Sequence, residues 1–224
     1  MSERRAALVI VLGTAVASAA CGSPEKRIVD QYFNALRAND NATLTSFAMV
    51  AFDKPVDQWK VTGTQPETRT PAVLAELARK VTDLETELAA NKKAAGAYSL
   101  ERYTDIDRVK ELQKAEKPIP SGLSKVAEEW GKFNDRDREL KKQLSEAKAA
   151  LEKERRNVSL SVGQVEDVEK LGGEMIQKTV DLELTIQGEP KPYTMVLRKY
   201  ELAAVDGGPR MVSRWVVQDL EPKG

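Results

Sequence analysis

Histidine is absent from this chain of 224 residues, and cysteine occurs only once. Histidine is the side chain that normally titrates near neutral pH, so acid–base catalysis would need a carboxylate or a tyrosine with a shifted pKa. A zinc site of cysteine and histidine ligands is excluded, and no acidic segment has the spacing of a calcium loop. We therefore expect no metal and no cofactor. A single cysteine also cannot form an intramolecular disulfide, so the fold depends on its core.

The chain also lacks an excess of charge of either sign, because 35 Lys and Arg residues balance 35 Asp and Glu residues. Nucleic-acid-binding proteins carry basic surfaces that neutralise phosphates, and the sequence has no basic stripe. A glycine-rich phosphate loop is missing as well, since Gly172-Gly173 and Gly207-Gly208 are typical of turns. The sequence therefore argues against nucleic acid as a partner.

The first 20 residues have the pattern of an export signal. A charged start, residues 1–5, precedes the uncharged apolar run of residues 6–20, which is shorter than the roughly 20 residues that span a bilayer. Three small residues, Ser18-Ala19-Ala20, stand directly before Cys21. This segment resembles the lipobox of bacterial lipoproteins, in which the signal peptide is removed and the cysteine is lipidated as the new N-terminus.

The resemblance implies that residues 1–20 are a signal peptide and that acyl chains such as palmitate on Cys21 anchor the protein to a membrane. It implies a location in the bacterial cell envelope, facing the periplasm in a Gram-negative organism. The alternative is an ordinary signal peptide, whose cleavage would leave Cys21 as a free thiol near the new N-terminus.

Composition divides the rest of the chain into a middle block, residues 70–157, and two flanks, residues 21–69 and 158–224. The middle block consists largely of Ala, Leu, Glu, Lys, Arg and Gln, which favour helices. Thr70-Pro71 predicts the N-cap and the first residue of a helix. Apolar residues then alternate spacings of three and four, typical of a coiled-coil seam: Leu74, Leu77, Val81, Leu84 and Leu88.

The sequence Pro118-Ile119-Pro120-Ser121-Gly122 cannot continue a helix and predicts a tip, followed by a second helical arm over about residues 123–156. Because few residues join the two arms, we expect an antiparallel coiled-coil hairpin. Gly96 and Asp105 fall between apolar positions of the first arm, which predicts a weakened or kinked stretch there. Two hypotheses stay open: the hairpin is a passive spacer, or it binds a partner such as another envelope protein.

The two flanks are expected to form the globular body. Ser23-Pro24 predicts the start of a helix whose apolar residues recur at helical spacing, and Asp40 or Asn41 predicts the cap of a second. Residues 59–64 predict a strand. Beyond the hairpin the apolar period changes to two, which predicts an antiparallel meander. Its expected segments begin at Val158, Leu160 and Val162 and continue over residues 179–186, 193–202 and 211–220.

Residues 29–40 (VDQYFNALRAND) and 214–220 (RWVVQDL) resemble the opening helix and the closing strand of nuclear-transport-factor-2-like, or SnoaL-like, proteins. The resemblance implies an α+β fold in which N-terminal helices cover a cone-like antiparallel sheet, with the helical hairpin as an insertion. A different α+β fold is the alternative. The family's pocket, between the first helices and the sheet, serves enzymes and binding proteins alike, so the fold does not decide the activity.

Four residues are candidates for lining such a pocket: Tyr32, Asp53, Asp57 and Trp59. Ordinary structural roles account for them as well, because Tyr32 falls in an apolar helical stripe and the aspartates near Pro55 are typical of loops. We therefore expect no enzyme, but a membrane-anchored interaction or scaffolding module. The alternative is a small-ligand-binding protein that uses the pocket. An enzyme would need a buried carboxylate with a raised pKa in it.

Overall fold

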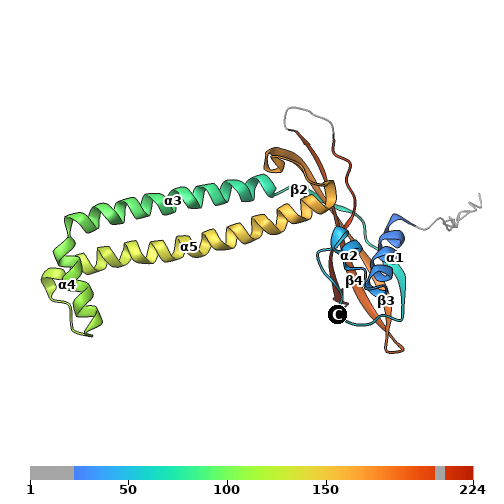
Figure 1. Ribbon diagram of the computed structural model, residues 1–224, viewed down its shortest axis with the longest axis horizontal. Coiled ribbons are helices and arrows are strands. Elements are labelled where there is room, and N and C mark those ends of the chain that lie inside the picture. Colours follow the sequence, from blue (N-terminus) through green and yellow to red (C-terminus); the bar gives the residue numbers. More distant parts are fainter. Residues whose placement is uncertain (1–22, 205–209, 224) are drawn as a thin grey trace, which may run out of the picture.

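The computed structural model describes residues 23–204 and 210–223. This part of the chain has an α+β fold, with five α-helices and a five-stranded antiparallel sheet that stays open. The sheet and two short helices form a body, and three further helices project from it (Figure 1). In chain order the elements are α1 (Pro24–Arg37), α2 (Asn41–Phe47), β1 (Gln58–Thr64), β2 (Thr68–Pro71), α3 (Leu74–Glu101), α4 (Tyr103–Lys114), α5 (Ser121–Val162), the 3-10 helix η1 (Val168–Lys170), β3 (Leu171–Ile186), β4 (Glu189–Ala204) and β5 (Val216–Pro222).

Both N-terminal helices begin where a side chain satisfies a free backbone N–H group. The Ser23 hydroxyl accepts a hydrogen bond from Lys26 N at 3.3 Å, and Asp40 Oδ1 accepts one from Thr43 N at 3.0 Å. Such caps are the usual start of a helix, so these two predictions are confirmed. The apolar side of α1 packs on the sheet.

Strands β3, β4 and β5 form an antiparallel meander, and β1 and β2 both pair with the other edge of β3. Gln187 and Gly188 have positive φ angles of 54° and 78° and join β3 to β4 as a two-residue turn. Side chains alternate between the two faces of a strand. Val180 and Leu182 therefore pack with α1 and α2, whereas Met175, on the other face, packs with α3 and α5.

The projecting helices α3, α4 and α5 are called the arm below. Helices α3 and α5 lie side by side and antiparallel, and α4 lies at their far end (Figure 1). The arm leaves the sheet on the side opposite to α1. With 42 residues at 1.5 Å per residue, α5 is about 63 Å long.

The predicted start of the arm is wrong. Thr70 and Pro71 lie in β2, where they pair with Met175 and Glu174, and α3 begins only at Leu74. Pairing with β3 gives the backbone of residues 68–71 its hydrogen bonds, so Thr70 does not serve as a cap. Pro71 ends this strand, a position where its missing N–H group is tolerated.

The predicted end of the arm is wrong as well, because Val158, Leu160 and Val162 lie in the last turns of α5 and not in a strand. Val158 and Val162 are four residues apart and share one side of a helix, so the same apolar pattern also fits a helical face. Both pack in the cluster that joins α3 and α5 to the sheet. Helix α5 ends at Gly163, which has a φ of 88°.

Two further expectations for the meander need correction. Gly172-Gly173 lies within β3 and is not a turn; a Cβ atom at Gly173 would lie 2.1 Å from the Glu201 carbonyl oxygen, so only glycine fits. The last strand begins at Val216 and not at Met211. Gly207-Gly208 lies outside the described residues.

Candidate functional site

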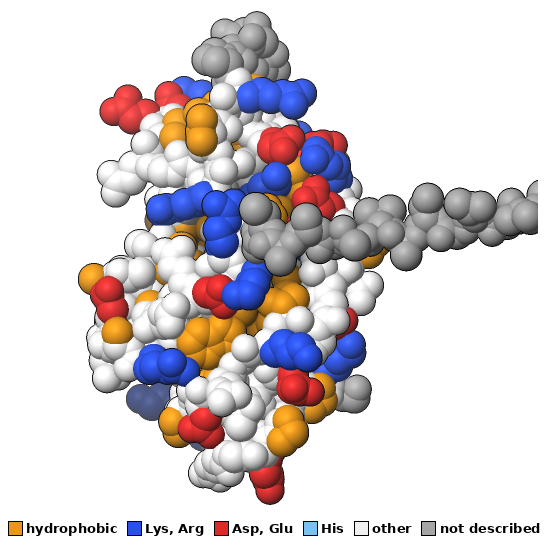
Figure 2. Space-filling model, turned by 90° about the vertical axis from the view of Figure 1, so that its right-hand side faces the viewer, with side chains coloured by type: hydrophobic (Ala, Val, Ile, Leu, Met, Phe, Trp, Pro, Cys, Tyr) orange, Lys and Arg blue, Asp and Glu red, His pale blue; other side chains and the backbone are white. Residues whose placement is uncertain are grey.

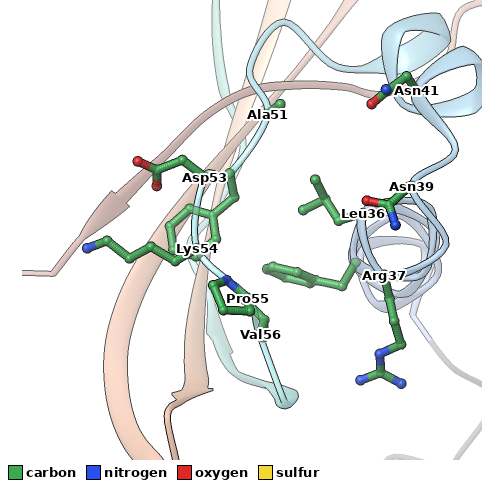
Figure 3. A pocket seen from close by; sticks show the side chains of 11 residues that line it. Leu36, Arg37, Asn39, Asn41, Ala51, Asp53, Lys54, Pro55 and Val56 are labelled. Atoms are coloured by element: carbon green, nitrogen blue, oxygen red, sulfur yellow. The ribbon is translucent and has the colours of Figure 1, made fainter.

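A cavity of about 500 Å³ lies between the C-terminal end of α1 and the loop that precedes β1. Its apolar lining includes Phe33, Leu36 and Phe52. In the close view, Leu36 extends towards the loop, whereas the charged ends of Asp53 and Lys54 point away from α1 (Figure 3). The cavity therefore has a mixed lining, because Arg37, Asn39 and Asn41 line it together with these apolar side chains.

The four predicted pocket residues do not meet in this cavity, and of them only Asp53 lines it. Tyr32 is fully buried, and its hydroxyl donates to the Val50 carbonyl oxygen at 3.1 Å. Burial raises the pKa of Tyr32 to about 12. Asp57 Oδ2 accepts a hydrogen bond from Gly188 N at 3.1 Å and ties the loop to the β3–β4 turn.

Trp59 is held by a set of structural contacts beside α1. Its indole N–H group donates to Asp30 Oδ1 at 2.9 Å, and its ring stacks on Phe33 with centroids 5.2 Å apart. The guanidinium of Arg37 lies 4.7 Å from the Trp59 ring and donates to the Asp57 carbonyl oxygen at 2.8 Å. Desolvation opposes ionisation of Asp30, but hydrogen bonds from Lys26 and Trp59 lower its pKa overall. These partners account for Trp59 as a packing residue.

The cavity has little that acid–base chemistry could use. Asp53 is the one carboxylate among the residues described as lining it, and its charged end points outwards (Figure 3). Tyr32, with its raised pKa, is engaged with the backbone and stays protonated near neutral pH. The arrangement suits the binding of a small molecule better than proton transfer.

Along the arm, the apolar seam is closed between α3 and α5. Leu84 and Leu88 of α3 are buried in one cluster with Leu140 and Leu151 of α5. The Asn91 side chain donates to the Phe133 carbonyl oxygen at 3.1 Å. Exposed ion pairs also cross between the helices, among them Lys148 with Glu85 at 2.7 Å. The predicted seam therefore stabilises the pair of helices itself.

The far end of the arm differs from its shaft, because α4 adds a third helix there. The helix breaks at Arg102, between α3 and α4, inside the stretch for which a kink was predicted. Ile106 and Val109 of α4 are buried, whereas two large apolar side chains beside the break are not. Leu100 is 84 % exposed and Tyr103 is 66 % exposed.

Where α5 meets the sheet, a buried polar network joins arm and body. Glu154 is only 6 % exposed, and its Oε1 accepts a hydrogen bond from the Tyr200 hydroxyl at 2.8 Å. Arg198 Nη1 lies 3.6 Å from Glu154 Oε2. Two turns later, the Ser161 hydroxyl donates to the Arg214 carbonyl oxygen at 2.9 Å and accepts from Tyr200 N at 3.1 Å. Burial and the neighbouring Glu154 raise the pKa of Tyr200.

Sequence reasoning missed this network. Its signal is positional: Glu154 follows Leu151 by three residues and precedes Val158 by four, so it falls on the side of α5 that carries the buried apolar residues. A carboxylate in such a position needs a buried partner, which is a reason to search the strands for one.

Among residues 23–204 and 210–223, no group of three or more His, Cys, Asp and Glu side chains could hold a metal ion. In the same part of the chain, no helix is both long and apolar enough for a membrane span. Cys21 lies outside the described residues, so its lipidation stays a prediction. Comparison of the chain with protein-family models, with curated proteins and with solved structures finds no match.

Proposed function

We propose that this chain is a membrane-anchored lipoprotein of the bacterial cell envelope, acting as a non-catalytic interaction or scaffolding module. The observation that carries the proposal is the placement of α1 and the arm on opposite sides of the sheet (Figure 1). Ser23, which starts α1, follows Cys21 by two residues. A lipid on Cys21 therefore holds the α1 side of the body at the membrane, and the arm points away from it.

The strength of such an anchor follows from its acyl chains. Each methylene group that enters the bilayer contributes roughly 0.8 kcal/mol, so two or three acyl chains hold the protein permanently. A protein held in this way needs no apolar transmembrane helix. The anchor also fixes the side of the molecule from which any partner has to approach.

The arm is suited to reach such a partner. Its seam is closed internally, so the shaft offers charged side chains to the solvent, while Leu100 and Tyr103 remain exposed at the far end. Exposed large apolar side chains close together are typical of contact sites. The proposal therefore assigns the contact to the far end and the role of a strut to the shaft.

For the body, we infer a cone-like sheet of the nuclear-transport-factor-2-like type with the arm as an insertion. Two helices precede the meander and cover one face of it, as in that family. Strands β2 and β3 are antiparallel neighbours, and the ends of their pairing, Pro71 and Glu174, lie opposite each other. A short turn could join such strands, and the arm stands in the place of that turn.

A second candidate function is the binding of a small ligand in the cavity beside α1. Its volume of about 500 Å³ and its aromatic lining favour this function. No group in the cavity indicates the chemistry of the ligand.

Photo-crosslinking in cells tests the interaction function. A photo-reactive amino acid replaces Leu100 or Tyr103 in the distal set, and the exposed shaft residues Lys92 and Lys141 in the control set. We expect one discrete crosslinked partner from the distal set and none from the shaft. Lys117, between α4 and α5, maps the edge of the contact. Background labelling at all five positions would contradict the proposal and leave the arm as a spacer.

Globomycin, which inhibits the lipoprotein signal peptidase, tests the anchor separately. Treated cells should accumulate the uncleaved precursor, and a Cys21→Ser variant should give the same precursor without the drug. Normal processing in the presence of globomycin would contradict the lipid anchor.

A further inference from the structure

We infer that the body docks on anionic phospholipid headgroups through a basic cavity beside the first turns of α1. This inference rests on the proposed lipid anchor at Cys21 and goes beyond it, because it assigns a surface and a ligand chemistry. The cavity measures about 400 Å³ and lies between α1, α2 and the segment before β5. Arg27, Gln31, Ser46, Arg214 and Trp215 are among the residues that line it.

The charge of the cavity favours a phosphate group. It holds two arginines, and none of the residues described as lining it is acidic. Arg27 is exposed and forms no ion pair or side-chain hydrogen bond with any described residue. Arg214 is already oriented, because its Nε donates to the Leu160 carbonyl oxygen at 2.7 Å and its Nη2 to the Ser46 carbonyl oxygen at 2.9 Å. Guanidinium groups bind phosphate oxygens with matched geometry.

Trp215 gives the cavity the character of a membrane-interface site. Its ring is partly buried, and two lysines approach it, with Lys199 Nζ at 4.9 Å and Lys178 Nζ at 5.9 Å from the ring centre. Lys178 is neutralised by Glu25, whose carboxylate oxygen lies 2.5 Å from its Nζ, so Arg27 and Arg214 remain the main charges for a ligand. Tryptophan with neighbouring basic residues is typical of the headgroup layer.

The short segment between Cys21 and Pro24 is the reason for choosing a lipid headgroup as the ligand of this cavity. Pro24 lines the cavity and follows Cys21 by three residues, so at no more than 3.6 Å per residue the cavity lies within about 11 Å of an acylated Cys21. That distance puts the headgroups within reach of the cavity. Figure 2 shows the end of the molecule that carries α1, where hydrophobic side chains gather with Lys and Arg side chains above them and on either side, and with single Asp or Glu side chains between them. Because the arm leaves in the opposite direction, docking leaves its far end free (Figure 1).

The test uses the acylated protein in vesicles. Once Cys21 is acylated, a Gln31→Cys substitution supplies the one free thiol, which takes a fluorophore at the rim of the cavity. A Lys141→Cys variant carries the same fluorophore on the shaft as a control. Vesicles of phosphatidylcholine, with or without one third phosphatidylglycerol, contain a quencher attached to the headgroup. We expect strong quenching at position 31 that needs phosphatidylglycerol and weakens at high salt, and none at position 141.

Two charge variants decide whether phosphate recognition causes the quenching. Arg27→Glu should reduce the docked fraction by roughly tenfold or more, because each basic residue near an anionic membrane contributes about 1 kcal/mol. Lys92→Glu makes the same charge change on the arm and should have no effect. Circular dichroism should show both variants folded, as expected for two exposed side chains.

Three outcomes would overturn the inference. Equal quenching at position 31 in both kinds of vesicle, unchanged by Arg27→Glu, would mean that the tether alone sets the distance. The absence of quenching would mean that the body stands clear of the membrane. Loss of the quenching on addition of soluble glycerophosphate at low concentration would identify a ligand from solution. Mass spectrometry of the N-terminal peptide separates the two proposals: without acyl chains the anchor itself is wrong, whereas acylated protein without lipid-dependent quenching contradicts only the docking.

Discussion

Replacing Tyr200 by phenylalanine removes one hydroxyl group from the junction of arm and body and keeps the ring in place. That hydroxyl donates to Glu154 Oε1 at 2.8 Å, and both side chains are buried. The remaining contacts of the carboxylate, with Asn157 Nδ2 at 3.4 Å and Arg198 Nη1 at 3.6 Å, are too long to replace it. A hydrogen bond to a charged group contributes about 1.5–3 kcal/mol. We therefore expect Tyr200→Phe to lower the free energy of unfolding by about 2 kcal/mol.

Tyr193→Phe is the matched control, because Tyr193 lies on the same strand and is also buried. Its ring packs edge-on against Phe52, and its hydroxyl has no hydrogen-bond partner among the described residues. We expect this variant to stay within about 0.5 kcal/mol of the parent protein. Urea unfolding followed by circular dichroism measures both free energies.

Tryptophan fluorescence shows which part of the protein loses stability in the Tyr200→Phe variant. Trp130 lies in the arm, whereas Trp59 and Trp215 lie in the body. If the network couples the two parts, Tyr200→Phe separates the transition reported by Trp130 from that of the other two. Variants in which only one tryptophan is kept allow each transition to be followed alone. A free-energy change below about 0.5 kcal/mol, with coincident transitions, would refute the assigned role of this hydrogen bond.

Two further predictions concern glycine and pH. Gly173→Ala should lower the free energy of unfolding by about 3 kcal/mol, because its Cβ would meet the Glu201 carbonyl oxygen. Gly131→Ala, in an open helical position, should instead raise it by about 0.5–1 kcal/mol. Thermal or urea unfolding measures both changes, and equal effects would contradict the assigned backbone conformations. Between pH 10 and about 12, Tyr32 loses its proton in the unfolded chain but keeps it in the folded protein, where its pKa is about 12. The free energy of unfolding therefore falls by about 3 kcal/mol over this range, and this contribution is fully present below pH 10. A urea series across this range should therefore fall less steeply for Tyr32→Phe, and parallel curves would refute the assignment.

The sequence was enough to predict the features that depend only on residues close together in the chain. Ser23 and Asp40 start helices because their side chains reach backbone N–H groups three residues on. The predicted seam of α3 also holds, because leucines at spacings of three and four can face only one side of a helix.

Tertiary contacts decided the rest. Thr70-Pro71 has the pattern of a helix cap, but residues 68–71 pair with the edge of β3 and form a strand. Val158 and Val162 fit either a strand or a helical face, and their packing against Leu202 and neighbouring residues selects the helix. The candidate pocket failed to assemble for a related reason. Tyr32 and Trp59 fill the space between α1 and the sheet themselves.

The buried end of α5 determines how the arm can work. From Leu151 to Ser161 this helix packs against the sheet and carries the Glu154–Tyr200 network, so about three turns belong to the body. The remaining 30 residues, 121–150, extend for about 45 Å at 1.5 Å per residue. A helix fixed in this way cannot swivel at its base without breaking buried hydrogen bonds. The distance between the α1 side of the body and the exposed Leu100 and Tyr103 is thus set by the fold, and the proposed role as a strut between a membrane and a partner requires such a fixed distance.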